Sequence, residues 1–391
     1  MSLGKIIKLF RNVKKKDTVE NYSDICFLKG KTKNYADAQQ QIQSEILKHL
    51  PKGKASIVES YIEERLNVGM FIQQKADVFV GHNVSDKNYL WTKRSDGTRA
   101  INSFSHVIVP GMWMKKRLLK SKSITLKPEQ IFVGGAPRVD YLRSLQEEYQ
   151  RTSAETKSRK KRVLWAPLHN SYKDSKNNVL SSYPAFSAYT TKLEQAFDLK
   201  VVLHPKNRTN KSALAKELVE ADVVISDYSS VVYEAWALGK PVIFPRWLLG
   251  DAMIQKAPDS AEAYLFKNNI GYHAQSFEEL QELLGKELTL SDDVRNFMQV
   301  YLDNFEPSKN ASQKIAKKLE IWADKELQAK EALSDKKRLE IEEALQRTMK
   351  QNDALAKRLK PSTKHDAKQS LISANIDFSD YEVAVYFFGT K

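Results

Sequence analysis

The segment ADVVISDYSSVVYEAWALGKPVIF, residues 221–244, places polar side chains between two apolar stretches. Asp227 ends the first stretch, Ser229 and Ser230 follow it closely, and Glu234 lies four residues after Ser230. Serine hydroxyls and the free N–H groups at the start of a helix bind anions, so this turn has the chemistry of a diphosphate site. Glu234 would then accept hydrogen bonds from ribose hydroxyls. The same serines also suit an ordinary helix cap without a ligand, so both interpretations stay open here.

Two histidines occupy similar positions at the ends of apolar stretches. His82 ends the apolar part of DVFVGHN, and His204 ends that of VVLHPKNR. A neutral imidazole near pH 7 can act as a general base, and Lys87 adds a cation five residues after His82. Lys206 and Arg208 follow His204, and their charges suit contact with a phosphate. A lone histidine at a strand end is also common as a structural residue, so neither role is assigned by spacing alone.

Two further turns carry polar residues, and several well-known motifs are missing from the sequence. In GGAPRVDYL, Arg138 can pair with Asp140 or face a phosphate, and in VLWAPLHNSY, His169 follows an apolar stretch. The seven histidines are scattered and the chain has one cysteine, so no zinc-ligand spacing occurs. The sequence also has no Walker loop, no GxGxxG and no GxSxG motif. We therefore expect no metal site and no cofactor.

These turns require a scaffold that brings the ends of several strands together. Short apolar stretches alternate with helical patterns, which predicts an α/β protein with mostly parallel sheets. The predicted strands are DICFLKG, DVFVGHN, SHVIVPG, QIFVGGAP, VLWAPLH, KVVLHPK, ADVVISD, KPVIFP and IGYHAQ. The predicted helices are ADAQQQIQSEILKHL, ESYIEERLNVGMFIQQ, SAYTTKLEQAF, SALAKELVE, SSVVYEAWALG and SFEELQELLGKEL.

The polar stretch EEYQRTSAETKSRKKR has no periodicity and predicts a linker between two α/β units. We therefore divide the chain into a basic amphipathic segment at 1–16, Rossmann-like domains at 17–150 and 151–325, and a helical extension at 326–391. Two such domains joined by a linker leave a cleft, and interfaces of this kind favour ligand sites.

The net charge of +15 favours anionic partners: nucleic acid, acidic lipid headgroups or phosphorylated substrates. The first sixteen residues, MSLGKIIKLFRNVKKK, combine apolar residues at helical spacing with lysines. This pattern matches a helix on an anionic membrane surface, or a helix packed on the first domain. Because the excess charge is concentrated in this segment and the linker, we expect no nucleic-acid partner. The single Cys26, and the absence of a membrane span or signal-peptide pattern, predict a cytoplasmic protein. The basic first segment adds the expectation that it is peripheral on the inner face of the cell membrane.

Taken in chain order, five motifs resemble those of the CDP-glycerol glycerophosphotransferases, the teichoic-acid primase and polymerase type. The matching residues are His82 and Lys87; Gly135, Pro137, Arg138, Asp140 and Leu142; Leu164, Ala166 and Pro167; His204 and Pro205; and Ala221 to Ser230 with Lys240 to Phe244. The resemblance implies a GT-B fold, in which two Rossmann-like domains face a cleft. The first domain would then receive the acceptor and the second would bind the nucleotide.

The same resemblance implies roles for the candidate residues. His82 would activate the acceptor hydroxyl, and His204 would stabilise the leaving or transferred phosphate. The residues implied to bind the donor are Arg138, Lys206, Arg208, Ser229, Ser230 and Glu234, with Lys87 and Asp227 in support; Asp227 is expected to fix the turn. The implied partners are CDP-glycerol or another nucleotide-activated donor, and a lipid-linked or polymeric glycan acceptor.

The chain departs from the family pattern around the first histidine. Asn83, Val84 and Ser85 stand where the family usually has Gly-Thr-Pro, and Val80 and Gly81 replace a tryptophan often seen before it. These departures leave the donor and the acceptor open. An alternative is a GT-B glycosyltransferase that uses a nucleotide sugar for capsule or lipopolysaccharide synthesis. A non-catalytic scaffold is a further alternative.

Overall fold

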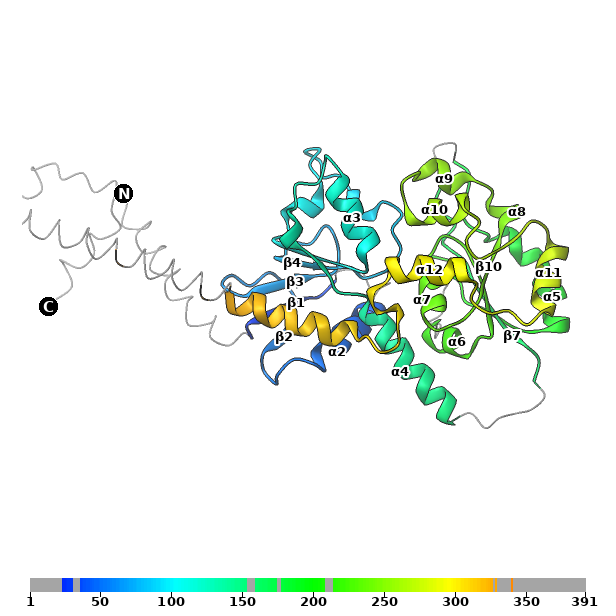
Figure 1. Cartoon of the computed structure of the whole chain (residues 1–391), viewed down its shortest axis with the longest axis horizontal. Coiled ribbons are helices and arrows are strands. Elements are labelled where there is room, and N and C mark those ends of the chain that lie inside the picture. The colour runs from blue at the N-terminus through cyan, green and yellow to red at the C-terminus, as the bar shows by residue number, and fades with distance from the viewer. Residues whose placement is uncertain are drawn as a thin grey trace, which may run out of the picture. The chain divides into compact units, whose positions relative to one another are not determined.

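The computed structural model describes residues 23–30, 36–152, 159–173, 177–207 and 214–325, together with Gln328 and Leu339 (Figure 1). The predicted basic segment 1–16, Arg208 and all but two residues of the predicted extension 326–391 lie outside these described residues. Residues 25–61 and 66–321 form one compact unit, which contains both sheets. The described residues 23–24, 62–65 and 322–325, with Gln328 and Leu339, belong to a second unit.

The first sheet has six parallel strands in the order β2-β1-β3-β4-β5-β6. The strands are β1 (Ile25–Leu28), β2 (Ala55–Val58), β3 (Leu66–Gly69), β4 (Val78–Val80), β5 (His106–Val109) and β6 (Ile131–Val133). The helices of this part are α2 (Ala36–Leu47), α3 (Met112–Lys120) and α4 (Pro137–Thr152), with short 3₁₀ turns η3 (Tyr89–Trp91), η4 (Ala100–Ser103) and η5 (Pro128–Gln130).

The helix predicted over ESYIEERLNVGMFIQQ is wrong, because this segment contains strand β3. Leu66, Val68, Met70 and Ile72 are buried and recur at every second residue, which is the period of a strand. Asn67, between them, is also buried, and its side-chain amide donates to Asp77 Oδ2 over 3.1 Å. The alternation is short and follows an acidic stretch, so the sequence pattern of the whole segment favours a helix.

The second sheet has five parallel strands in the order β11-β10-β9-β7-β8. The strands are β7 (Arg162–Ala166), β8 (Asp198–Val201), β9 (Val223–Ser226), β10 (Val242–Pro245) and β11 (Tyr272–Ala274). The helices are α5 (Thr190–Ala196), α6 (Leu214–Glu220), α7 (Ser230–Ala237), α8 (Arg246–Leu249), α9 (Ala252–Lys256), α10 (Ala261–Lys267), α11 (Phe277–Gly285) and α12 (Asp292–Tyr301), with η6 (Ala185–Tyr189) and η7 (Asp303–Phe305). Every strand predicted from the sequence is present, and β2 and β3 are additional.

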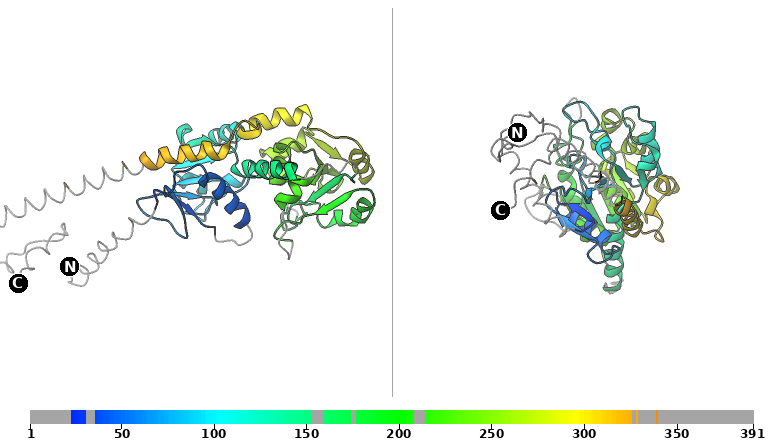
Figure 2. Two further views of the ribbon diagram at one scale, coloured as in Figure 1. Left: turned by 90° about the horizontal axis from the view of Figure 1, so that it is seen from below. Right: turned by 90° about the vertical axis from the view of Figure 1, so that its left-hand side faces the viewer.

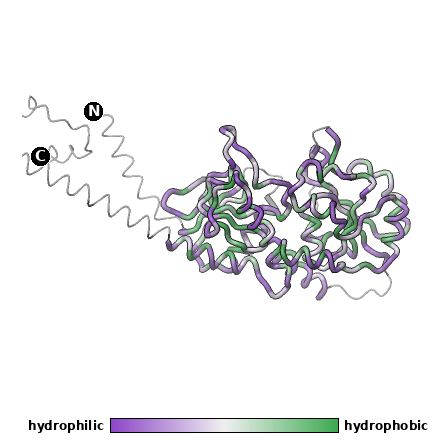
Figure 3. The backbone as a smooth tube through the Cα atoms, turned by 45° about the horizontal axis from the view of Figure 1, so that its top comes forward, coloured by the Kyte–Doolittle hydropathy of each residue, from purple (hydrophilic) through white to green (hydrophobic). Residues whose placement is uncertain are grey.

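Each sheet is built from apolar strands, so most of the apolar segments in Figure 3 run through the middle of the fold. Parallel strands buried on both faces carry continuous apolar runs, as in the fully buried β9. Helix α7 is apolar around most of its circumference and buries Val232, Tyr233, Ala235 and Trp236. A helix of this kind lies in a protein interior, which fixes the position of its first turn.

Helix α4 contacts α2, which accompanies the first sheet, and α6 and α7, which accompany the second; it is visible in the views of Figures 1 and 2. The Arg143 side chain donates to Phe305 O over 2.6 Å and to Ala237 O over 3.3 Å. The Asp140 carboxylate accepts from the backbone N–H and hydroxyl of Ser312, at 2.7 and 2.6 Å. The segment after α12, which contains Phe305 and Ser312, therefore packs against α4. The domain boundaries drawn from the sequence stay predictions.

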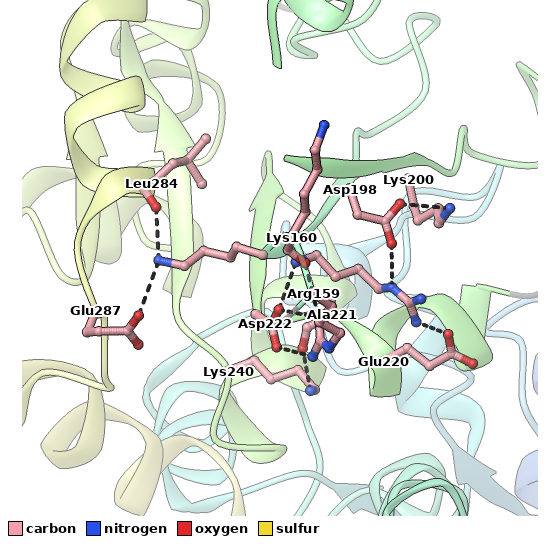
Figure 4. Close-up of polar contacts among 12 residues, drawn as sticks. Arg159, Lys160, Asp198, Lys200, Glu220, Ala221, Asp222, Lys240, Leu284 and Glu287 are labelled. Atoms are coloured by element: carbon pink, nitrogen blue, oxygen red, sulfur yellow. Dashed lines mark hydrogen bonds and ion pairs between the residues drawn. The ribbon is translucent and has the colours of Figure 1, made fainter. Parts of the chain in front are cut away.

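A network of charged side chains lies at the amino ends of the second sheet's strands (Figure 4). Arg159 binds both carboxylate oxygens of Asp222, at 2.7 and 2.8 Å. Arg162 binds Asp198 over 2.9 Å and also Glu220. These two arginines come from the basic end of the predicted linker. Their charges are thus neutralised by acids, at the sheet edge opposite to the carboxyl ends of the strands.

Candidate active site

The candidate residues follow the carboxyl ends of strands in both sheets, where open α/β sheets bind ligands. His82 lies two residues after β4, and Asp227 follows β9 directly. The loop after β4 is held against the start of α10 by reciprocal hydrogen bonds. Asp86 Oδ2 accepts from the backbone N–H of Ala261 over 3.0 Å, and Glu262 accepts from the backbone N–H groups of Asp86 and Lys87 over 2.9 and 2.8 Å. These bonds bring the two sets of loops together.

His82 is held in one tautomer by its neighbours. Its Nδ1 lies 3.1 Å from the carbonyl oxygen of Met70, which can only accept, so Nδ1 carries the proton. Its Nε2 lies 2.8 Å from the side-chain amide nitrogen of Asn83. Burial lowers the pKa of His82 to about 4, the Met70 hydrogen bond opposes this, and the charge of Lys87 adds to it. His82 is therefore neutral at pH 7, and Nε2 is its basic atom.

His204 is held in the opposite tautomer. Its Nδ1 accepts a hydrogen bond from the backbone N–H of Lys206 over 3.2 Å, so the neutral ring carries its proton on Nε2. The ring centroid lies 4.8 Å from that of His169. The structure thus groups His204 with His169, and it groups His82 with the rings of Phe71 and Tyr89 at 4.6 and 5.4 Å.

A lysine cluster, defined as Lys87, Lys206 and Lys256, surrounds His169. Burial lowers the pKa of His169 to about 4, and the charges of Lys206, Lys87 and Lys256 lower it further, in that order. The ammonium groups of Lys256 and Lys87 lie 4.1 and 5.6 Å from the ring centroid of Tyr172. Burial also lowers the pKa of Lys87, while Glu262 and Asp227 oppose this effect. Cations that converge on one place favour an anionic ligand there.

The serine turn at the start of α7 does not form the side-chain cap expected from the sequence. Ser226 donates its hydroxyl proton to Ala166 O over 2.7 Å, so Ser229 is the donor in the 3.0 Å hydrogen bond between the two serines. Ser229 is the N-cap residue, but its side chain makes no capping hydrogen bond. Ser230 donates instead to the hydroxyl of Ser85, in the loop after β4, over 3.3 Å. The backbone N–H groups of this helix start retain the direction that favours anions.

Asp227 connects three segments beneath this turn. Its Oδ2 accepts from the backbone N–H groups of Leu168 and Ser182 over 2.8 and 2.9 Å, and from the Ser181 hydroxyl over 3.0 Å. The residue is fully buried, and burial raises the pKa of its carboxyl group, while the hydrogen bonds lower it. These bonds tie the residue after β9 to the segments of Leu168 and Ser182, and the role of Asp227 in fixing the turn stays a prediction.

Arg138 pairs with Glu234, a partner that the sequence did not suggest. Arg138 Nε donates to Glu234 Oε1 over 2.9 Å, and Nη1 donates to Gln41. Burial raises the pKa of Glu234, while Arg138 opposes the rise. Asp140 is not the partner, since Ser312 and Asn304 occupy its oxygens.

The Arg138–Glu234 pair and His82 line one cavity of about 40 Å³, and Asn83 and Ser85 also line it. A volume of this size holds water molecules and is too small for a nucleotide. Its polar groups nevertheless place the candidate base, a buried ion pair and the residues after β4 around a common space.

Sequence reasoning missed several residues of this region. Asp86 lies between His82 and Lys87, and Tyr172 ends VLWAPLHNSY, but residue type alone gave neither a role. Glu262 and Lys256 follow no predicted strand end, so the tertiary contacts reveal these residues. Arg117 also holds Asp86, at 2.5 and 2.7 Å from its two carboxylate oxygens. One signal was present: Ser260 precedes the helix that carries Glu262, and its hydroxyl accepts from Ala263 N–H over 3.1 Å as an N-cap.

Residues 78–320 match the family described as CDP-glycerol:poly(glycerophosphate) glycerophosphotransferase. The chain belongs to this family. The family resemblance drawn from the five motifs is therefore confirmed, and this chain is an enzyme of the glycerophosphotransferase family. A comparison with the curated proteins gives no match.

Solved structures of the wall teichoic acid polymerase TagF have a similar fold. One has 17% sequence identity and a TM-score of 0.50, and the match covers 85% of this chain and 99% of that chain. A histidine-to-asparagine variant of TagF has 16% identity and a TM-score of 0.52, and the match covers 84% of this chain and 100% of that chain. At these identities the likeness concerns the fold: two parallel, Rossmann-like sheets in a GT-B-like architecture.

Two further observations concern the described part of this glycerophosphotransferase-family chain. It contains no group of three or more His, Cys, Asp or Glu residues that could hold a metal ion. None of its helices combines the length and the apolar composition of a transmembrane span.

Proposed function

We propose that this enzyme transfers glycerol phosphate, or a related polyol phosphate, from a CDP-activated donor to a hydroxyl group of a membrane-linked cell-surface glycan or polymer. Family membership supports the class of reaction. The observation that carries the assignment of roles is the pair of opposite tautomers at His82 and His204. One ring offers a basic Nε2, and the other offers an Nε2–H donor.

In the proposed reaction, His82 Nε2 takes the proton of the acceptor hydroxyl while the oxygen of that hydroxyl attacks the β-phosphorus of the donor. A new P–O bond forms, the bond between the β-phosphorus and the bridging oxygen breaks, and CMP leaves. His204 donates its Nε2–H to the leaving or transferred phosphate. Placed donors and cations of this kind stabilise the charge that develops during phosphoryl transfer.

The donor phosphates are proposed to bind between the start of α7 and the lysine cluster. Ser229, Ser230 and the first backbone N–H groups of α7 contribute dipoles, and Lys87 and Lys206 contribute charge. Arg208 is proposed to contribute on sequence grounds, since it lies outside the described residues. Arg138 and Glu234 hold each other, so their proposed role near the donor is to fix α4 against α7. The sequence had suggested a ribose contact for Glu234, which stays a prediction.

The test compares donors directly. The enzyme is incubated with an oligomeric glycerol phosphate acceptor and either CDP-glycerol, a UDP-sugar or a CMP-sugar, and release of CMP or UDP is measured. We expect CMP release from CDP-glycerol alone, and a decrease of about 10²–10⁴-fold in the His82→Gln variant. The matched control is His49→Gln, at an exposed histidine two residues after the end of α2. Turnover of a nucleotide sugar with no use of CDP-glycerol would refute the donor assignment and favour the glycosyltransferase alternative.

Residues 1–16 are proposed to attach the enzyme to the inner face of the cell membrane. The support comes from the sequence, where apolar residues recur at helical spacing, lysines supply positive charge and no acidic residue opposes them. Sedimentation with anionic lipid vesicles should fall when this segment is deleted or when salt is raised. Equal sedimentation of the full chain and the deletion variant would reject this attachment.

A further inference from the structure

Asn83 donates a hydrogen bond to the basic atom of the candidate general base. Its side-chain amide nitrogen lies 2.8 Å from His82 Nε2, and its amide oxygen accepts from the Ser85 hydroxyl over 3.4 Å. The orientation of the amide follows from the tautomer. Because His82 carries its proton on Nδ1, Nε2 needs a donor, and the amide oxygen in that place would set two acceptors face to face.

The hydrogen bonds continue to the start of α7. Ser230 donates to the Ser85 hydroxyl, Ser85 donates to the Asn83 amide oxygen, and Asn83 donates to His82. His82 then donates to Met70 O. In all four hydrogen bonds the donor is the residue nearer to Ser230 and the acceptor is the residue nearer to Met70. Each of the two serine hydroxyls therefore donates its proton to one acceptor. The chain of bonds links the proposed phosphate site in one sheet to the proposed base in the other.

We infer that Asn83 and Ser85 are positioning residues that keep His82 Nε2 covered until donor phosphates bind at the start of α7. The inference rests on the proposed function, because it takes the α7 turn as the donor site. A phosphate oxygen is a stronger acceptor than a serine hydroxyl, so it takes the Ser230 proton away from Ser85. Hydrogen bonds in a chain strengthen one another, so loss of the first bond weakens the hold of Ser85 on Asn83.

Release of Asn83 exposes the basic nitrogen to the acceptor hydroxyl. In the covered state the lone pair of Nε2 is occupied, so His82 cannot take a proton from another group. In the released state the acceptor O–H replaces the amide N–H at the same atom. The enzyme thereby couples two binding events, and the base becomes available only when a donor phosphate is present to be attacked. Asn83 and Ser85 stand at positions where this chain departs from the usual family pattern, so this coupling is a property of this chain's own residues.

The test follows the His82 ring by nuclear magnetic resonance in the full-length protein labelled at histidine, with His82→Gln to assign its signal. The probe is CDP, which carries the diphosphate but no transferable group. In the wild-type protein we expect CDP to shift the His82 ring nitrogen signals. In Ser85→Ala we expect CDP to bind with unchanged affinity and to leave these signals where they were. Ser44→Ala is the matched control, since the hydroxyl of this exposed α2 serine donates within its own helix, to Gln40 O and Gln41 O.

A second variant tests the cover on Nε2 without any ligand. Asn83→Leu keeps the size of the side chain and removes the donor, so the neutral form of His82 loses a hydrogen bond and its pKa rises by about one pH unit. Lys87 lowers the pKa of His82 by its charge and the Tyr89 ring contacts it, and both residues remain in this variant. Asn83→Asp should raise the pKa further, because a carboxylate favours the imidazolium form.

The outcomes separate this inference from the proposed function. An unchanged His82 pKa in Asn83→Leu overturns the cover, whatever the donor is. If CDP binds but the wild-type His82 signals do not move, or move equally in Ser85→Ala, the coupling is overturned and the proposed function stands. If CDP does not bind at all, the donor assignment and the coupling both fail, and the cover on Nε2 is still decided by the Asn83→Leu result.

Discussion

Replacement of Asp227 by alanine or asparagine should separate a structural role from a role in contacting substrate. The carboxylate is fully buried and accepts two backbone N–H groups, from Leu168 and Ser182. The Ser181 hydroxyl also reaches it, but this hydroxyl has Leu168 O as a second acceptor at 2.6 Å. Alanine therefore leaves two buried backbone donors without a partner.

The size of the effect follows from these contacts. Each buried donor that loses its partner costs about 1–3 kcal/mol, so Asp227→Ala should lower the free energy of unfolding by about 2–6 kcal/mol. Asparagine keeps an oxygen for the same two donors and exchanges charged for neutral hydrogen bonds. We expect Asp227→Asn to cost about 1–2 kcal/mol. Its amide nitrogen would take the place of Oδ1, which has no hydrogen-bond partner among the described residues.

Urea unfolding followed by circular dichroism measures both values, and CMP release measures activity at a temperature where each variant is folded. The structural account predicts that Asp227→Asn loses stability in the stated range and keeps most of its activity. The reasoning is refuted if Asp227→Ala is as stable as the wild type. It is also refuted if folded Asp227→Asn loses as much activity as His82→Gln, because Asp227 would then act on the substrate.

Two further predictions concern His82 and the buried ion pair. Because the pKa of His82 is lowered to about 4, its base form is favoured above that pH, and at pH 5.5 about 97% of His82 is neutral, against about 9% for an ordinary histidine. The kcat/KM profile should thus show no loss from His82 between pH 7 and 5.5, and a limb near pH 6.5 that disappears in His82→Gln would contradict this. Glu234→Gln removes the charge that neutralises buried Arg138 and should lower the free energy of unfolding by about 3–5 kcal/mol, measured with urea. An apolar double substitution, Arg138→Met with Glu234→Leu, should recover much of that loss, and a double variant no more stable than Glu234→Gln would argue against charge burial as the cause.

The sequence predicted the two-sheet α/β architecture well because buried parallel strands leave continuous apolar runs. It failed at β3, where the alternation of Leu66, Val68 and Met70 is short and follows the acidic pair Glu63 and Glu64. Strand β2 was missed for a related reason, since only Val58 at its end is buried. Edge strands of this kind carry a weak apolar signal.

The strand-end histidines and the serine turn could also be found from the sequence, because residue type and position relative to an apolar run are local features. The partners of these residues could not be found in this way. Arg138 and Glu234 form a hydrogen bond although they are 96 residues apart in the sequence, and Asp86 and Glu262 do so although they are 176 residues apart. Such pairings are set by the packing of the two sheets, which no local pattern records. The tautomers of His82 and His204 depend on backbone groups and were equally beyond sequence reasoning.

The most direct test of the central proposal is a crystal structure of the His82→Gln variant soaked with CDP-glycerol. The account predicts that the diphosphate lies at the start of α7, with the His204 Nε2–H directed at a phosphate oxygen. The β-phosphorus should face the side chain at position 82, with room for an acceptor hydroxyl between them. A nucleotide bound elsewhere, or a β-phosphorus turned away from both positions 82 and 204, would contradict the proposed mechanism.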